Sequence, residues 1–169
     1  GSQYQSGALG LNNTVKYSSP MQVGTDTTWH GISINGNQDE WATCLALKTD
    51  GTLWSWGVDQ GGSLGHGGGT TRSSPTQIGA NTTWGTGTYT GIKNGGDYSF
   101  TVASSSAAVK TDGTLWTWGN NSEGNLGHNN TSGPNSPVQV GTSQNWNGVA
   151  TGGIFSNEGV SWYFEKTTT

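Results

Sequence analysis

The chain has 169 residues, and its 6 basic and 10 acidic side chains give a net charge of −4. So few Lys and Arg residues exclude the long phosphate-binding surface of a general nucleic-acid-binding protein. Hydrophobic residues make up only 29% of the chain, but 9 Trp, 5 Tyr and 3 Phe are too many large apolar side chains for a disordered polymer. The composition therefore predicts one folded domain that is rich in β structure.

The single cysteine, Cys44, excludes an internal disulfide framework and a multi-cysteine zinc site. We expect it to be a small buried core residue. No stretch approaches the run of about 18 apolar residues that a membrane span requires, so we expect no insertion into a membrane. The sequence also predicts no metal site and no cofactor.

Three landmarks recur along the chain at fixed spacing. A Leu-Gly pair is followed after 10 residues by a proline, and the proline is followed after 9 residues by a tryptophan. The sets are Leu9-Gly10, Pro20 and Trp29, then Leu64-Gly65, Pro75 and Trp84, then Leu126-Gly127, Pro137 and Trp146. This self-similarity predicts a single repeat domain, residues 1–169, with units at approximately 1–56, 57–118 and 119–169.

A second phrase occurs twice, at Lys48–Gly57 and Lys110–Gly119, and reads Lys-Thr-Asp-Gly-Thr-Leu-Trp-Ser/Thr-Trp-Gly. Its Asp-Gly pair predicts a type I′ hairpin turn between strands at 45–47 and 53–56. Trp54 and Trp56 have the strand period of two, so they share one face and are predicted to be structural. A unit of 55 to 62 residues with such a hairpin matches one blade of a β-propeller.

The string Leu47–Gly57, with the later Leu-Gly pair and the phrase Ser-Ser-Pro-Thr-Gln-Ile-Gly, resembles the regulator of chromosome condensation repeat. The resemblance covers essentially the whole chain. It implies an all-β propeller, usually of seven blades, that serves as a platform for protein interactions. Family members have unrelated functions, including nucleotide exchange on a small GTPase, inhibition of β-lactamases and ultraviolet sensing, so the fold does not fix the function.

Three repeats make an incomplete ring, because a propeller needs about four to eight blades to close. The sequence therefore predicts a partial propeller, or one assembled with other chains or segments. We favour an excerpt of a longer propeller. A head-to-tail homo-oligomer that completes the ring is the alternative.

The length between each landmark tryptophan and the lysine at the repeated position, Lys48, Lys110 or Lys166, varies, at 19, 26 and about 20 residues. Loops on a rigid scaffold are natural binding elements, and these segments combine aromatic rings with carboxylates. The candidate binding residues are Asp39, Glu40, Trp41, Asp97, Tyr98, Phe100, Phe155, Glu158 and Trp162. The alternative is that these rings only cap the ends of the blades.

Catalytic residues are not indicated. His66 and His128 occupy one repeated position after Leu-Gly, and Asp50 and Asp112 are repeated turn residues, so all four are expected to be structural. The string Gly61–Gly65 has the form Gly-x-Ser-x-Gly, but no helix is indicated after it, so it lacks the context of a nucleophile elbow. We expect the chain not to be an enzyme.

The low charge and the many Gly, Ser, Thr and Asn residues favour a non-catalytic structural or recognition module displayed on a tailed-phage virion or a cell surface, and hence an extracellular or virion-surface location. Its partner would be a protein or a glycan. The alternative is a protein-binding regulator or inhibitor, intracellular or secreted, that uses the propeller face.

Overall fold

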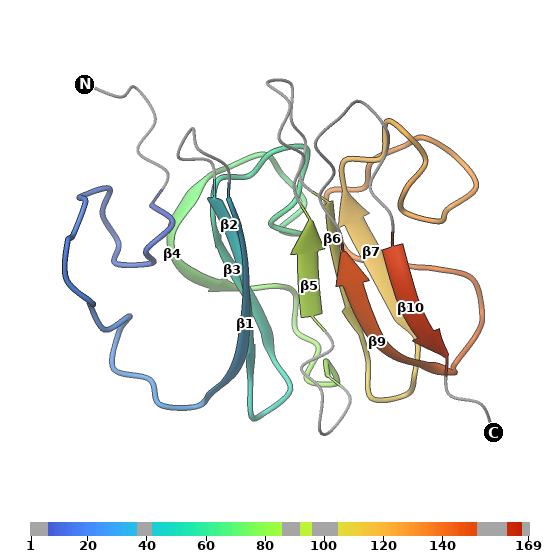
Figure 1. Cartoon of the computed structure of the whole chain (residues 1–169), viewed down its shortest axis with the longest axis horizontal. Coiled ribbons are helices and arrows are strands. Elements are labelled where there is room, and N and C mark those ends of the chain that lie inside the picture. Colours follow the sequence, from blue (N-terminus) through green and yellow to red (C-terminus); the bar gives the residue numbers. More distant parts are fainter. Residues whose placement is uncertain (1–6, 37–41, 86–91, 96–104, 152–161, 167–169) are drawn as a thin grey trace.

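The computed structural model describes residues 7–36, 42–85, 92–95, 105–151 and 162–166, and for 92–95 and 162–166 it describes the backbone alone. These residues form ten strands in three antiparallel sheets (Figure 1). This part of the chain contains no helix, and therefore none of a length and apolarity that could cross a membrane. The all-β fold of short antiparallel strands is confirmed.

The first two sheets have the same simple up-and-down order. The first is β1 (Trp29–Gly36), β2 (Ala42–Lys48), β3 (Leu53–Gly57) and β4 (Arg72–Gln77). The second is β5 (Ile92–Gly95), β6 (Ser105–Val109), β7 (Leu115–Gly119) and β8 (Val138–Gln139), and the third pairs β9 (Trp146–Thr151) with β10 (Trp162–Lys166). Each four-stranded sheet thus takes its fourth strand from the sequence unit that follows.

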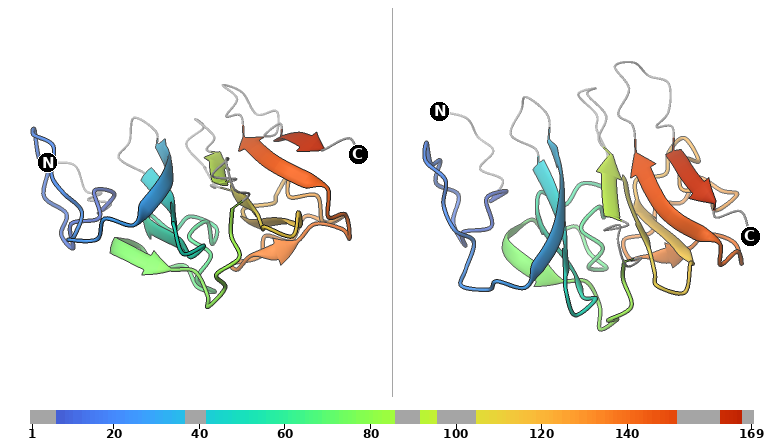
Figure 2. Two further views of the ribbon diagram at one scale, coloured as in Figure 1. Left: turned by 90° about the horizontal axis from the view of Figure 1, so that it is seen from below. Right: turned by 60° about the horizontal axis from the view of Figure 1, so that its bottom comes forward.

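The three sheets stand side by side in chain order (Figure 2). β1 contacts β5, and β5 contacts β9, so the first strands of the sheets lie nearest to one another. This is the arrangement of blades around a propeller axis.

Buried side chains between the sheets hold the blades together. Leu45 and Leu47 of β2 share one buried cluster with Ala108 of the second sheet. On the other side of β6, Val109 lies in a cluster with Val149 of the third sheet. Because successive strand residues point to opposite faces, β6 contributes to both interfaces of the second sheet.

The hairpin between β2 and β3 is confirmed, but the predicted type I′ turn is wrong. Such a turn needs positive φ at both central residues, and in this loop only Gly51 has one, at +78°. The Gly51 amide donates to the Lys48 carbonyl, as in a type I turn followed by a left-handed glycine. The Asp50 carboxylate accepts both the amide and the hydroxyl of Thr52, which holds Asp50 in this turn.

We expect Gly51→Ala to lower the free energy of unfolding by about 3 kcal/mol or more. Gly51 has positive φ, and an added Cβ would overlap the carbonyl oxygen of Thr82 in the next unit. Gly79 has a similar φ of +61° with nothing within 4 Å of its Cβ position, so Gly79→Ala should cost only about 1 kcal/mol of backbone strain. Urea unfolding of both variants tests this, and equal losses would contradict the role given to Thr82.

Candidate functional site

The residues predicted to bind a partner lie mainly outside the described part of the chain. This applies to Asp39, Glu40, Trp41, Asp97, Tyr98, Phe100, Phe155 and Glu158. Trp162 begins β10, where its backbone pairs with Thr151, but its side chain is not described. The structure does describe the two strands that each of these segments connects.

The segments 37–41, 96–104 and 152–161 occupy equivalent places in the fold. Each connects the first and second strands of its sheet, β1 to β2, β5 to β6 and β9 to β10. The three first strands lie next to one another and end on the side of the molecule that is uppermost in Figure 1. The connections therefore leave three adjacent blades on one common side.

Each of the first two blades contains a cluster of three tryptophans with a lysine. Trp29 lies edge-on to Trp54, with ring centroids 5.9 Å apart, and 6.0 Å from Trp56. The Lys48 ammonium lies 3.7 Å from the centroid of Trp54 and 4.7 Å from that of Trp29. The contacts with Trp29 confirm that Trp54 and Trp56 share one face, and the lysine adds a cation–π attraction.

The second blade repeats the cluster with one change in charge. Lys110 lies 3.8 Å from the Trp116 centroid and 4.9 Å from that of Trp84. In the first blade Asp26 forms an ion pair with Lys48 at 2.5 Å, but the equivalent position in the second blade is Asn81. Lys110 is buried, and this burial lowers its pKa.

The sequence analysis missed these lysines, although each precedes its Asp-Gly turn by the same interval as in the other unit. The Lys48 ammonium and the hydroxyl and amide of Thr28 lower the pKa of Asp26. The ion pair and the ring contacts commit Lys48 to the scaffold. Both ammonium groups lie over tryptophan rings of their own blade.

A serine and a histidine lie in contact in the first blade. Ser55 Oγ is 2.7 Å from the Leu64 carbonyl oxygen and 2.9 Å from His66 Nε2. The carbonyl can only accept, so the single hydroxyl proton points to Leu64 and His66 must donate through Nε2. A histidine that donates to the hydroxyl cannot remove its proton, so the pair is not arranged as nucleophile and base.

The second blade has the same arrangement. Thr117 Oγ1 is 2.8 Å from the Leu126 carbonyl oxygen and 2.9 Å from His128 Nε2. The two histidines therefore connect the loop after each third strand to that strand. Within the described residues, no group of three His, Cys, Asp or Glu side chains is placed to hold a metal ion.

Cys44 is buried, as expected, and burial raises its pKa to about 12. Its thiol donates to the Ala8 carbonyl at 3.4 Å. A thiol held in this form is a weak nucleophile.

Comparisons with known proteins agree with this geometry. The family model "Regulator of chromosome condensation (RCC1) repeat" matches residues 112–156. The E3 ubiquitin-protein ligase HERC2 of Homo sapiens is 37% identical over 87 residues, which are 50% of this chain and 2% of the ligase. Prp20p of Saccharomyces cerevisiae superimposes on 97% of this chain and 38% of its own, with a TM-score of 0.67 and 19% identity. Residues 112–156 carry an RCC1 repeat.

Human WBSCR16 is a further structural neighbour, with a TM-score of 0.53 and 23% identity over 78% of this chain and 30% of its own. At these identities the two solved structures show the propeller fold. The chain spans 2% of HERC2 and 38% or less of the solved structures.

The first two blades differ in one buried polar group. Asn121 accepts the Leu126 amide and donates to the Asn130 and Ser132 carbonyls. Asp59 at the equivalent position accepts the Leu64 amide, but its Oδ2 is buried without a hydrogen-bond partner in the described part of the chain. Burial raises the pKa of Asp59.

We expect His66 to make stability fall as the pH falls below 6.5. Burial and the positive charge of Arg72 lower the pKa of His66 from its ordinary value of 6.5. As the pH falls, the unfolded chain therefore takes up a proton on His66 before the folded chain does. The contribution of His66 to the free energy of unfolding is complete above pH 6.5 and is lost as the pH falls from 6.5 to the lowered pKa of the folded state. The slope of unfolding free energy against pH, measured from pH 7.5 to 5.0, should be smaller in His66→Gln. A slope unchanged in this variant would contradict the assignment.

Asn81→Asp should stabilise the second blade by about 0.5–1 kcal/mol at low salt, because it copies the Asp26–Lys48 pair beside the buried Lys110. Thr83 is present to bond the new carboxylate, as Thr28 bonds Asp26. The matched control is the same substitution in a Lys110→Met background, where the gain in thermal unfolding should disappear. An equal gain in both backgrounds would show that Lys110 is not the partner.

Proposed function

We propose that this chain is a non-catalytic protein-binding module whose binding surface is formed by the three connections 37–41, 96–104 and 152–161. The observation that carries the proposal is that these connections leave three adjacent blades on one side. They are also segments in which the repeats differ in composition. A rigid scaffold with variable connections on one side suits recognition of a partner.

The chemistry of the scaffold supports a non-catalytic role. In the hydroxyl–histidine pairs of the first two blades, each hydroxyl donates its proton to a backbone carbonyl, that of Leu64 or Leu126. Asp50 and Asp112 each accept an amide and a hydroxyl within their own turns, and these bonds lower the pKa of both carboxyls. We infer that these groups stabilise the blades and do not take part in a reaction.

The composition of the connections suggests the character of the partner. They contain the carboxylates of Asp39, Glu40, Asp97 and Glu158 beside aromatic rings, in a chain of net charge −4. Carboxylates attract a basic surface, and aromatic rings supply contact area. Among the structural neighbours, Prp20p is described with binding to Gsp1p and histones, and yeast RCC1 (Prp20) is described bound to Kap60.

Two more specific expectations are supported only by the composition of the chain. Display on a virion or cell surface rests on the low charge and the polar residues, and glycan binding rests on the aromatic rings. We therefore restrict the proposal to a protein partner with a basic surface.

The test uses purified histones as the basic protein and biolayer interferometry as the measurement. We expect Trp41→Ala and Tyr98→Ala each to weaken binding about tenfold, since aromatic anchors at an interface often contribute more than 1 kcal/mol. Tyr17→Ala is the control, because Tyr17 is an exposed aromatic residue outside the connections. Equal binding by all three variants would refute the assigned surface, and glycan-array binding lost in Trp41→Ala would favour a sugar ligand instead.

A further inference from the structure

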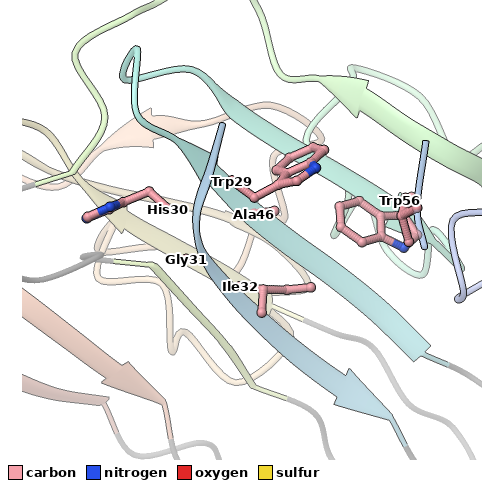
Figure 3. A pocket seen from close by; sticks show the side chains of 7 residues that line it. Trp29, His30, Gly31, Ile32, Ala46 and Trp56 are labelled. Atoms are coloured by element: carbon pink, nitrogen blue, oxygen red, sulfur yellow. The ribbon is translucent and has the colours of Figure 1, made fainter. Parts of the chain in front are cut away.

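The segments that lead into the first two blades share one framework. Residues 24–29 read Gly-Thr-Asp-Thr-Thr-Trp, and residues 79–84 read Gly-Ala-Asn-Thr-Thr-Trp. In the first blade Trp29 ends this segment and lies beside Trp56 (Figure 3), with ring centroids 6.0 Å apart. The same contact in the second blade has a centroid distance of 6.4 Å. The two segments therefore end on equivalent tryptophans and can be compared residue by residue.

In the first blade three donors hold the carboxylate of Asp26. The Thr28 amide donates to Asp26 Oδ1 at 2.8 Å, and the Thr28 hydroxyl donates to the same oxygen at 2.6 Å. The Lys48 ammonium forms an ion pair with the other oxygen, Oδ2. Two donors of one threonine and the ammonium at the end of β2 thus define a place for one carboxylate group.

The same three donors recur in the second blade. Thr83 is equivalent to Thr28, and Lys110 is equivalent to Lys48. In both blades the threonine carbonyl accepts the amide of the residue that follows the lysine. In both blades the landmark tryptophan also pairs with the lysine. The backbone therefore places Thr83 and Lys110 relative to each other as it places Thr28 and Lys48.

The acceptor for these donors is missing in the second blade. The position of Asp26 is occupied by Asn81, whose side chain is exposed and uncharged. Among the described residues, neither Asn81 nor any other group accepts a hydrogen bond from the Thr83 amide, the Thr83 hydroxyl or the Lys110 ammonium. The donors that hold a carboxylate in one blade thus have no acceptor in the other.

Lys110 differs from an ordinary surface lysine. Its side chain is 8% exposed, and its ammonium lies 3.8 Å from the centroid of Trp116 and 4.9 Å from that of Trp84. The rings supply a cation–π attraction but no negative charge. A buried charge without a partner is costly, and burial lowers the pKa of Lys110. An anion beside the ammonium would offset this cost.

The nearby carboxylate of Asp112 does not take this place. It accepts two hydrogen bonds within its own turn, and it forms no ion pair with Lys110, although both residues are described. Asp50 holds the equivalent turn in the first blade, where Lys48 still pairs with Asp26. A carboxylate in the turn therefore leaves room for a second carboxylate on the lysine.

We propose that Thr83 and Lys110 form a carboxylate-binding site at the hairpin end of the second sheet. One oxygen of the bound group accepts the Thr83 amide and hydroxyl, and the other pairs with the Lys110 ammonium, as the Asp26 carboxylate does in the first blade. Hydrogen bonds to a charged group are shorter and stronger than neutral ones. The carboxylate comes from a small free acid or from an acidic side chain of a protein partner.

The site is separate from the connections to which we assign protein binding. The connection 96–104 precedes β6, whereas Lys110 follows the other end of that strand. A ligand at the hairpin end leaves the connection side open. The site therefore goes beyond the proposed function, and histone binding by the connections neither supports nor contradicts it.

Titration of the full chain with sodium acetate at constant ionic strength tests the site, with the backbone amide resonances in heteronuclear NMR spectra as the measurement. We expect a saturable downfield shift of the Thr83 amide, with a dissociation constant on the order of 10 mM, because one carboxylate makes few contacts. The Thr28 amide already has its acceptor and should shift little. No saturable shift of Thr83, or an equal shift with chloride, would overturn the proposal.

Two substitutions remove the site by different means. Lys110→Met removes the charge but keeps an apolar stem over the rings, and it should weaken acetate binding at least about tenfold. Asn81→Asp supplies a carboxylate within the chain, so the donors are occupied and acetate should no longer shift the Thr83 amide. Undiminished acetate binding in either variant would contradict the assigned donors.

Asp26→Asn makes the converse change in the first blade. It removes the carboxylate between Thr28 and Lys48 and so copies the arrangement of the second blade. We expect this variant to bind two acetate ions instead of one, with a new saturable shift of the Thr28 amide. A variant that is folded but gains no second shift would show that the three donors do not suffice for a site.

A second ligand identifies the source of the carboxylate. The peptide acetyl-Gly-Glu-Gly-amide carries one side-chain carboxylate and no charged ends. Binding about tenfold tighter than that of acetate would assign the site to an acidic side chain of a protein partner, because the peptide backbone then adds contacts. Equal or weaker binding of the peptide would assign it to a small free acid.

Discussion

The indole N–H of the second tryptophan in each Leu-Trp-x-Trp-Gly strand connects its blade to the Leu-Gly segment that precedes that blade. Trp118 Nε1 donates to the Ser63 carbonyl at 2.9 Å, and Trp56 Nε1 donates to Ala8 at the same distance. The acceptor directly precedes a Leu-Gly pair, and a Cβ on Gly65 would lie only 2.8 Å from the Trp118 nitrogen. A buried indole without an acceptor is costly, so the tryptophan and the Leu-Gly pair depend on each other in each of these two interfaces.

This dependence explains how much of the fold the sequence could predict. The hairpins and blades follow from phrases that recur at fixed spacing, because equivalent residues make equivalent contacts. The turn type was mispredicted because it depends on the bonds from Thr52 to the Asp50 carboxylate, which compete with the backbone preference of an Asp-Gly pair. The position of Lys48 over two rings could not be predicted, since it requires the register of β2 against β1 and β3.

The candidate site was predictable only in its location. Aromatic rings and carboxylates in the Trp-to-Lys segments pointed to the connections, and the strands that carry them share one side of the molecule. Most of the extra length of the second unit instead lies between Trp84 and Ile92, before β5. Which carboxylates and rings meet there depends on side-chain packing among three separate segments, and a repeat pattern carries no information about residues that differ between repeats. By contrast, Asn81 holds the repeated position of Asp26, so the carboxylate missing beside Lys110 becomes informative once the Asp26–Lys48 pair is seen.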